Sequence, residues 1–177
     1  MSGCEHYIRK CCLVSPCCNK IYPCRFCHDD NEDHELNRRD VTLVKCIQCD
    51  TVQKVAANCI ICRIRFGFYF CSICRLYDDA DKGQFHCELC GLCRTGGREN
   101  YFHCSKCDIC FVKSLRDSHK CLEKSSHSNC PICLESLRAS RDPCQVLECG
   151  HLLHRKCFQD CATSRIISCP LCNAKMT

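Results

Sequence analysis

Apolar residues along this chain occur in short runs interrupted by polar residues and cysteines, a pattern that predicts short strands and helices joined by loops. An aromatic turn around Gly67 and a polar stretch from Lys124 to Asn129 separate three cysteine-rich segments, and the polar stretch is predicted to be a flexible linker. The charged run from Glu35 to Asp40 predicts a solvated loop or a short helix. No apolar run is long enough to cross a membrane, and no secretory signal is expected at the N-terminus.

Cysteine content changes this picture, because 28 of the 177 residues are Cys, none is Trp, and aromatic residues make up only 7%. A conventional hydrophobic core would be thin, so metals or disulfides are needed to hold the fold. The nine His residues lie beside the Cys pairs, which favours metal sites in a reducing compartment over a disulfide framework. The predicted fold class is therefore a set of small zinc-stabilised modules, mostly loops with short strands and helices.

The charge distribution gives little support to a nucleic-acid partner. The formal net charge is +5, and the Lys and Arg residues are scattered instead of forming one basic stripe. No finger with a DNA-recognition helix is present. Zinc-bound thiolates also add negative charge, so the formal charge is a weak guide to partners.

Eight ligands at the C-terminal end have spacings that fit two tetrahedral zinc ions. Their order is a Cys pair, a Cys-x-His, a His-x2-Cys and a final Cys pair, and it resembles the RING finger. The alternative is two independent structural fingers. By the resemblance, the pairs interleave, so that one ion takes Cys130, Cys133, His154 and Cys157, and the other takes Cys149, His151, Cys169 and Cys172.

The first segment contains a self-contained zinc-ribbon set, made of two Cys-x2-Cys pairs separated by the loop 50–58. Eight further ligands precede it and suffice for two more ions, but the spacing does not assign each ligand to its ion. The ribbon ligands are Cys46, Cys49, Cys59 and Cys62. The eight others are Cys4, His6, Cys17, Cys18, Cys24, Cys27, His28 and His34.

The second segment contains an internal repeat, in which Phe-His-Cys-x2-Cys-x2-Cys recurs after 17 residues. Tight turns seldom let four such ligands meet one ion, so interleaving between successive repeats is expected. The predicted grouping has three ions. The first zinc ion takes Cys71, Cys74, Cys87 and Cys90. The second zinc ion takes His86, Cys93, Cys104 and Cys107. The third zinc ion takes His103, Cys110, His119 and Cys121.

A family resemblance rests on the Cys4-Glu5-His6-Tyr7 string, the segment from Tyr22 to His28 and the repeat. These resemble the CHY and CTCHY zinc fingers, and together with the RING-H2 finger they resemble the RING finger and CHY zinc finger domain-containing ubiquitin ligases. The resemblance implies a CHY-type finger with three zinc ions over residues 1–66, a CTCHY-type finger with three over 67–124, a linker over 125–129, and a RING-H2 finger with two over 130–173. The total is about eight structural zinc ions, with no coordination position left open.

In such ligases the RING finger docks a ubiquitin-conjugating enzyme and promotes ubiquitin transfer to lysines of protein substrates, which directs them to the proteasome. The chain itself would form no covalent ubiquitin intermediate, and its contribution to the rate would be positioning. The resemblance implies docking through Ile132, Pro170, Leu171 and a helix that begins near His154. Packing in a small local core is the alternative for these apolar residues. A shared nuclear and cytoplasmic location is also implied.

Two positions depart from common RING sequences. Cys161 stands where a large aromatic residue often occurs, and Asn173 stands where a basic residue often helps to clamp ubiquitin. The second departure predicts modest intrinsic activity, or help from dimerisation or from the CHY segment.

Five metal-type residues remain outside the ligand sets and are expected to have no metal role. A catalytic thiol is not expected among them, because no dedicated His base accompanies any of the four cysteines. A zinc deaminase is disfavoured, because no His-x-Glu precedes the Cys pair at Cys24. The remaining alternative to a ligase is a non-catalytic zinc scaffold or a nucleic-acid-binding regulator. The five residues are Cys11, Cys12, His127, Cys144 and Cys161, and Cys11 is the one that could exchange roles with Cys17 or Cys18.

Overall fold

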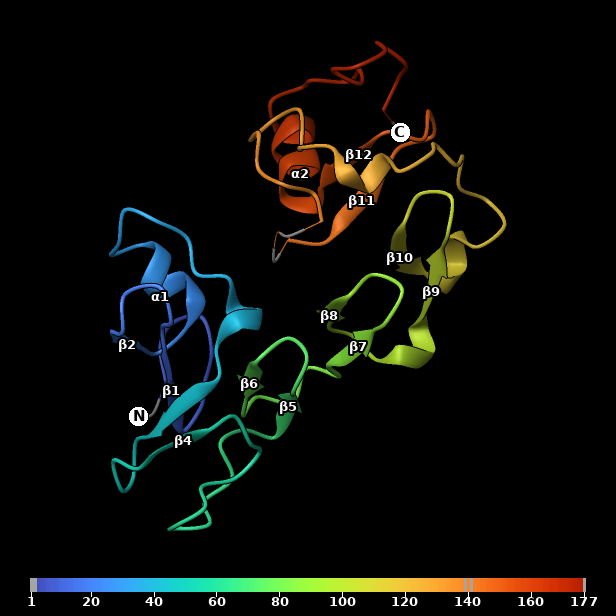
Figure 1. Cartoon of the computed structure of the whole chain (residues 1–177). Coiled ribbons are helices and arrows are strands. Elements are labelled where there is room, and N and C mark those ends of the chain that lie inside the picture. Colours follow the sequence, from blue (N-terminus) through green and yellow to red (C-terminus); the bar gives the residue numbers. More distant parts are fainter. Residues whose placement is uncertain (1–2, 139, 141, 177) are drawn as a thin grey trace. The chain divides into compact units, whose positions relative to one another are not determined.

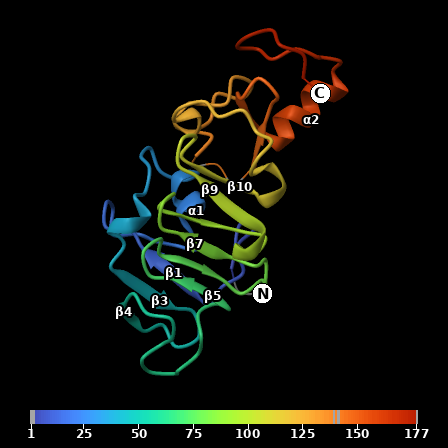
Figure 2. The ribbon, with the colours of Figure 1, turned by 90° about the vertical axis from the view of Figure 1, so that its right-hand side faces the viewer.

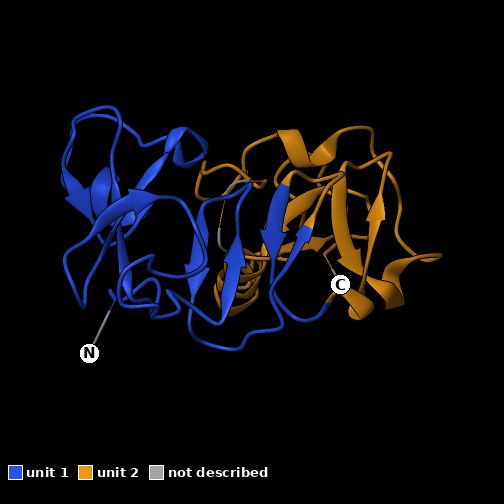
Figure 3. Cartoon of the chain, turned by 60° about the horizontal axis from the view of Figure 1, so that its bottom comes forward, with its two compact units in different colours: residues 1–86, 92–97 blue, residues 87–91, 98–177 orange. Residues whose placement is uncertain are grey.

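The computed structural model describes residues 3–138, 140 and 142–176 (Figure 1). The chain forms two compact units, shown in different colours in Figure 3. Unit 1 comprises Met1–His86 with Leu92–Gly97, and unit 2 comprises Cys87–Gly91 with Arg98–Thr177. Short strands and turns dominate both units, so the predicted class of small zinc-binding modules is confirmed.

Unit 1 is built on a four-stranded antiparallel sheet in the order β2-β1-β3-β4. Figure 2 shows β1, β3 and β4 side by side. In β1, Cys11 and Leu13 are buried while the alternate residues are partly exposed, because successive side chains of a strand point to opposite faces. The strands are β1 (Cys11–Val14), β2 (Ile21–Tyr22), β3 (Leu43–Cys46) and β4 (Val52–Lys54).

The core of unit 1 is small and partly aromatic. Phe66 and Phe70 pack against the buried Tyr77 with ring centroids 6.0 and 4.8 Å away, so the aromatic turn predicted around Gly67 contributes to the core. A Cβ atom at Gly67 would lie 2.9 Å from the backbone nitrogen of Asp78, which explains why glycine is needed there.

Three two-stranded hairpins follow along the chain. The second and third carry the 17-residue repeat, one hairpin for each copy. Their strands are β5 (Tyr69–Cys71) with β6 (Leu76–Asp78), β7 (Phe85–Cys87) with β8 (Leu92–Arg94), and β9 (Tyr101–Cys104) with β10 (Ile109–Val112).

Helices are few and short. The charged run from Glu35 to Asp40 ends in a single 3-10 turn, and a helix follows His154, where the resemblance placed one. A last hairpin, β11 (Cys144–Val146) with β12 (Leu152–His154), precedes that helix. The α-helices are α1 (Arg25–Asp29) and α2 (Arg155–Thr163), and the 3-10 helices are η1 (Arg38–Asp40), η2 (Arg98–Asn100), η3 (Lys113–Leu115) and η4 (Ser125–His127).

Unit 2 has one core that continues from the third hairpin into the C-terminal segment. Ile109 and Phe111 of β10 belong to the same buried cluster as Leu137, Leu147 and Leu153. The final copy of the repeat and the RING-like segment therefore share buried apolar surface, which stabilises them together.

The stretch predicted to be a flexible linker is anchored within unit 2. The Lys124 N–H donates to the carbonyl of Lys106 at 2.7 Å, and the Ser126 N–H donates to that of Cys107 at 3.3 Å. The buried Ser126 hydroxyl donates to the carbonyl of Asp108 at 2.9 Å. Three hydrogen bonds thus fix the path of the chain between the third hairpin and Cys130.

No helix in the described part of the chain combines the length and apolar character needed to cross a membrane.

Candidate metal centres

Seven Cys-x2-Cys turns share one backbone conformation, in which the residue after the second cysteine is left-handed. Arg63, Leu134 and Asn173 have φ of 64°, 64° and 56°. Their N–H groups donate to the carbonyls of Cys59, Cys130 and Cys169 at 3.1, 2.9 and 2.8 Å. This closed turn, called a knuckle below, aims both sulfurs of a pair toward one point. Asp50, Arg75, Gly91 and Asp108 occupy the same position in four other knuckles.

The first candidate site joins the N-terminal string to Cys24 and Cys27 at the start of helix α1. The Nδ1 atom of His6 lies 3.5 Å from Sγ of Cys24, 3.6 Å from Sγ of Cys27 and 4.0 Å from Sγ of Cys4. The N–H of Cys27 donates to Sγ of Cys24 at 3.4 Å, so the helix start also holds a ligand sulfur in place.

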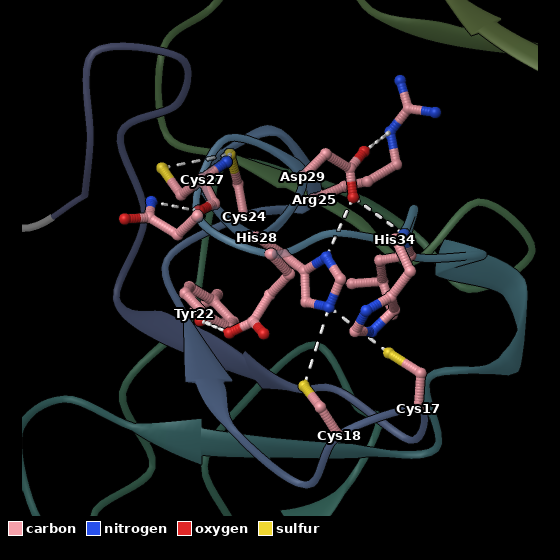
Figure 4. Close-up of polar contacts among 12 residues, drawn as sticks. Cys17, Cys18, Tyr22, Cys24, Arg25, Cys27, His28, Asp29 and His34 are labelled. Atoms are coloured by element: carbon pink, nitrogen blue, oxygen red, sulfur yellow. Dashed lines mark hydrogen bonds and ion pairs between the residues drawn. The ribbon is translucent and has the colours of Figure 1, made fainter.

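The second candidate site gathers Cys17, Cys18, His28 and His34 (Figure 4). The Nε2 atom of the fully buried His28 lies 3.3 and 3.6 Å from the two sulfurs, while its Nδ1 lies 2.9 Å from a carboxylate oxygen of Asp29. The carboxylate fixes the imidazole so that Nε2 faces the sulfurs, as it does beside many metal-bound histidines.

His34 provides the clearest sign that this site fits a metal. Its Nδ1 lies 2.9 Å from a carboxylate oxygen of Asp33, but its buried Nε2 has no hydrogen-bond partner. A buried nitrogen without a partner is costly. A tetrahedral ion among the two sulfurs and two imidazoles would satisfy it.

The third site contains the two ribbon pairs of unit 1. Sγ of Cys46 lies 3.7 Å from Sγ of Cys62, and Sγ of Cys49 lies 3.5 Å from Sγ of Cys59. Hydrogen bonds from the hydroxyl and the N–H of Thr51 lower the pKa of the Cys49 thiol to about 6. Cys49 therefore favours the thiolate, which is the form that binds metal.

These separations match zinc and exclude disulfides. With Zn–S bonds of about 2.3 Å, tetrahedral sulfurs lie about 3.8 Å apart, whereas a disulfide brings them to about 2.05 Å. No disulfide occurs among the described residues. The described part of the chain contains eight groups of three or more side chains that could hold a metal ion, so the molecule has multiple Cys/His zinc sites.

In the repeat segment, the structure overturns the predicted grouping, although it brings the same twelve side chains into clusters. Cys71 and Cys74 meet His86 and Cys93, where we predicted Cys87 and Cys90. The next knuckle meets the His and third Cys of the following hairpin in the same way. The first observed set is Cys71, Cys74, His86 and Cys93, and the second is Cys87, Cys90, His103 and Cys110. In the third, His119 lies near Cys104 and Cys121, and the Cys121 thiol interacts with that of Cys107.

Strand geometry explains the error. His103 of β9 lies directly opposite Cys110 of β10, so both side chains point to the same face of the hairpin. Cys104 is the next residue along β9 and points to the opposite face. A histidine and the cysteine beside it therefore serve different sites, and each of the first two knuckles takes its remaining ligands from one face of the following hairpin.

The RING-like segment brings its eight ligands into the two interleaved groups that the resemblance implies. Nδ1 of His154 lies 3.2 Å from Sγ of Cys133, and the thiol of Cys157 interacts with those of Cys130 and Cys133. In the other group, Nδ1 of His151 lies 3.5 Å from Sγ of Cys149 and 3.6 Å from Sγ of Cys169. The Cys149 thiol also interacts with Cys172, which completes that group.

The three predicted docking residues lie on the two outer knuckles of this segment. Ile132 is 38% exposed and Leu171 is 57% exposed, although both sit between metal ligands, and Pro170 is exposed too. Cys161, in helix α2, is only 2% exposed. The position where other RING sequences often have a large aromatic residue therefore faces the interior here.

The residues left outside the ligand sets have structural environments. Cys11 is buried in the core of unit 1, and burial raises the pKa of its thiol to about 12. Burial also raises the thiol pKa of Cys12 and of Cys161. The Cys144 thiol donates to the carbonyl of Leu137 at 3.2 Å, and His127 Nε2 lies 2.6 Å from a carboxylate oxygen of Asp108.

Sequence reasoning missed the acidic residues that orient the ligand histidines. Asp29, Asp33 and Asp108 each contact an imidazole, and Asp108 lies 3.5 Å from Nε2 of His103. The first two are sequence neighbours of their histidines, and Asp108 directly follows a ligand cysteine. An acidic residue next to a predicted ligand in the sequence could have indicated these orienting contacts.

Comparison with known proteins agrees with this arrangement. The CHY zinc finger family matches residues 4–69, and the Ring finger domain family matches residues 128–173. The chain is 49% identical over 97% of its length to the E3 ubiquitin-protein ligase SRFP1 of Oryza sativa subsp. japonica, and it covers 67% of that protein. It is 44% identical over 97% of its length to the E3 ubiquitin-protein ligase RZFP34 of Arabidopsis thaliana, and it covers 62% of that protein.

This chain belongs to the CHY and RING finger E3 ubiquitin ligases. The family resemblance seen in the sequence is thereby confirmed. A longer relative, the Zinc finger protein BRUTUS-like At1g18910 of Arabidopsis thaliana, is 43% identical over 98% of this chain, which covers only 14% of that protein. Membership of this RING-type ligase family implies a ubiquitin-conjugating enzyme and ubiquitin as partners.

Proposed function

We propose that this chain acts as a RING-type ubiquitin ligase, which docks a charged conjugating enzyme and promotes ubiquitin transfer to substrate lysines. The exposure of Ile132 and Leu171 supports this most directly. Apolar side chains fixed between metal ligands cannot turn inward, and such exposed groups normally mark a partner surface. Pro170 and the start of helix α2 complete the proposed docking surface.

The chemistry occurs on the conjugating enzyme, so the chain needs no catalytic side chain of its own. Its contribution to the rate is to hold the thioester-linked ubiquitin in a reactive arrangement. We propose that all zinc ions are structural, because each set of four Cys and His ligands closes a tetrahedral site. Zinc would supply the rigidity that keeps the two outer knuckles at a fixed separation.

The ligand assignment and domain division belong to this proposal. They comprise a CHY-type finger over 1–66, a CTCHY-type finger over 67–124 and a RING-H2 finger over 130–173, with about eight zinc ions. The first two would recruit substrates or regulate the RING finger. Substrates would be directed to the proteasome in the nucleus and cytoplasm, as the family resemblance implies.

Autoubiquitination with a panel of conjugating enzymes tests the proposal. We expect ubiquitin chains with at least one enzyme and their loss in the Ile132→Ala variant. Absence of activity with every enzyme, in protein with full zinc content, would show instead that the chain is a non-catalytic scaffold or a nucleic-acid-binding regulator.

A further inference from the structure

Four arginines line one pocket in unit 1 that also reaches two candidate zinc sites. The cavity volume is about 20 Å³, at the bottom of about 270 Å³ of empty space that includes open solvent, and no carboxylate lies among the residues that line it. Cys24 of the first candidate site and Cys74 of the first repeat site contribute to its wall. The arginines are Arg9, Arg25, Arg38 and Arg75.

Arg9 is the most buried of the four and has unused hydrogen-bond donors. Its side chain is 2% exposed, yet its Nε and Nη2 atoms have no hydrogen-bond partner. The guanidinium lies 5.4 Å from the centre of the Tyr7 ring, so an aromatic face supports it without satisfying those donors. A buried cation with free donors is a costly arrangement unless an acceptor binds there.

Arg75 also has a donor to spare, and Arg25 is held mainly by an aromatic ring. The buried Nε atom of Arg75 has no partner, while its Nη1 donates to the carbonyl of Ser72. Arg25 stacks on the Phe26 ring at 4.5 Å, and its ion pair with Asp29 is long, at 4.0 Å. Rings and backbone thus hold the guanidinium groups of Arg9, Arg25 and Arg75, and Arg9 and Arg75 keep donors that are unused.

Charge balance shows that the neighbouring zinc sites do not neutralise this pocket. Each of the two sites offers three thiols and one imidazole, so that with three thiolates and a divalent ion bound it would carry one negative charge. Four arginines carry four positive charges, and the two site charges together with the Asp29 carboxylate paired with Arg25 offset three of them. A phosphoryl group carries about −1.5 to −2 at neutral pH and offers three acceptor oxygens, one more than a carboxylate, to the donors that remain unused.

We propose that this pocket binds a phosphorylated side chain of a protein partner. Planar guanidinium groups match the oxygens of a phosphoryl group, and several converging arginines are the usual way to recognise one. The inference rests on the proposed ligase function in one respect, since it assigns the pocket to the recognition of a phosphorylated substrate. Its binding test is independent of ubiquitin transfer.

The test uses the full zinc-loaded chain and fluorescent peptide libraries with one central residue and mixed flanks. Three libraries carry phosphoserine, serine or glutamate at the centre, and inorganic phosphate serves as a competitor. Fluorescence polarisation should show the phosphoserine library binding at least about tenfold more tightly than the serine library. Inorganic phosphate should compete only at much higher concentration.

Matched variants test whether the pocket itself is responsible. The double variant Arg38→Gln, Arg75→Gln removes two pocket charges and should weaken phosphopeptide binding at least about tenfold. The double variant Arg39→Gln, Arg63→Gln removes the same charge from outside the pocket and should bind within about twofold of the parent. Arg39 follows Arg38 in η1, and Arg63 occupies the same left-handed position after its knuckle as Arg75.

Three results would overturn the proposal: equal binding of phosphorylated and unphosphorylated libraries, equal losses in the two double variants, or inorganic phosphate binding as tightly as phosphopeptide. If the pocket variant fails to fold, hydrogen exchange on the parent chain decides. Phosphopeptide should slow exchange around Arg38 and Leu76, and unchanged exchange there would reject the site. A parallel ubiquitin-discharge assay on the same samples separates failure of this site from failure of the RING function.

Discussion

Arg138 donates from Nη2 to the backbone carbonyl of Cys90 at 2.8 Å, although 48 residues separate them in the chain. Its Nη1 forms an ion pair with Asp108, the residue that also contacts the ligand His103. One side chain from the RING finger is thus attached to two knuckles of the repeat segment. Within unit 2, the RING finger and these knuckles are held as one body.

Replacing Arg138 by Ala should destabilise unit 2 by about 1–3 kcal/mol, because it removes the hydrogen bond to a carbonyl and one of the partners of the half-buried Asp108 carboxylate. Thermal unfolding followed by circular dichroism measures the effect. The exposed Arg155 of helix α2 provides the control, since its replacement by Ala should change stability by less than about 0.5 kcal/mol. Equal stability of the two variants would show that the Arg138 contacts contribute nothing.

Truncating Ile132 should reduce ubiquitin discharge from the conjugating enzyme at least about tenfold, because apolar side chains at the centre of an interface supply much of its affinity. Since the side chain is exposed, the melting temperature should hardly change. Leu134→Ala, two residues further on and 71% exposed, should retain activity. Loss of activity in both variants would indicate a broader surface than the proposed one.

Replacing Asn173 by Arg should raise the rate of ubiquitin discharge several-fold, because it supplies the basic group that often clamps ubiquitin. The backbone there is left-handed, and Arg63 and Arg75 already tolerate that conformation after other knuckles. We expect a stability loss of about 1 kcal/mol or less, since Asn accepts this conformation more readily than Arg. Single-turnover discharge kinetics compare the two proteins, and equal rates would remove the clamp hypothesis.

Native mass spectrometry of the intact chain should find about eight zinc ions, one for each four-ligand set. Chelation should unfold the protein, because structural zinc in finger peptides contributes about 10–16 kcal/mol, much of it as folding free energy. Cooperative unfolding that survives complete zinc removal would contradict this expectation. Six or fewer ions would break the assignment in at least one segment.

Replacing Cys11 by Ala and replacing Cys17 by Ala should have different effects on the zinc content of the protein. The Cys11→Ala variant should keep its full zinc content and lose about 1–2 kcal/mol of stability from the core, whereas Cys17→Ala should lose one ion. Zinc loss from the Cys11 variant instead would mean that this cysteine exchanges roles with Cys17.

Sequence spacing predicted which side chains cluster, because the Cys-x2-Cys knuckle is a local structure that four residues define. It did not predict which knuckle meets which histidine in the repeat. The alternation of His86 and Cys87 along one strand contained that information, but spacing alone does not tell a strand from a turn.

Long-range contacts account for what the sequence could not provide. The anchoring of residues 124–126 depends on carbonyls about 18 residues earlier, and the arginine pocket assembles residues from Arg9 to Arg75. Lys124 to Asn129 has the composition of a linker, and only the positions of its partners fix it.

The alternating strands also have a consequence for how metal enters the repeat segment. His86 and Cys87 belong to neighbouring sites, as do His103 and Cys104, and one peptide bond joins the members of each couple. An ion that binds in one site therefore immobilises the residue that the next site needs, which lowers the entropy cost of filling it. Zinc loading of the repeat segment should therefore be cooperative between neighbouring sites, and zinc release should begin at the terminal sites of the segment.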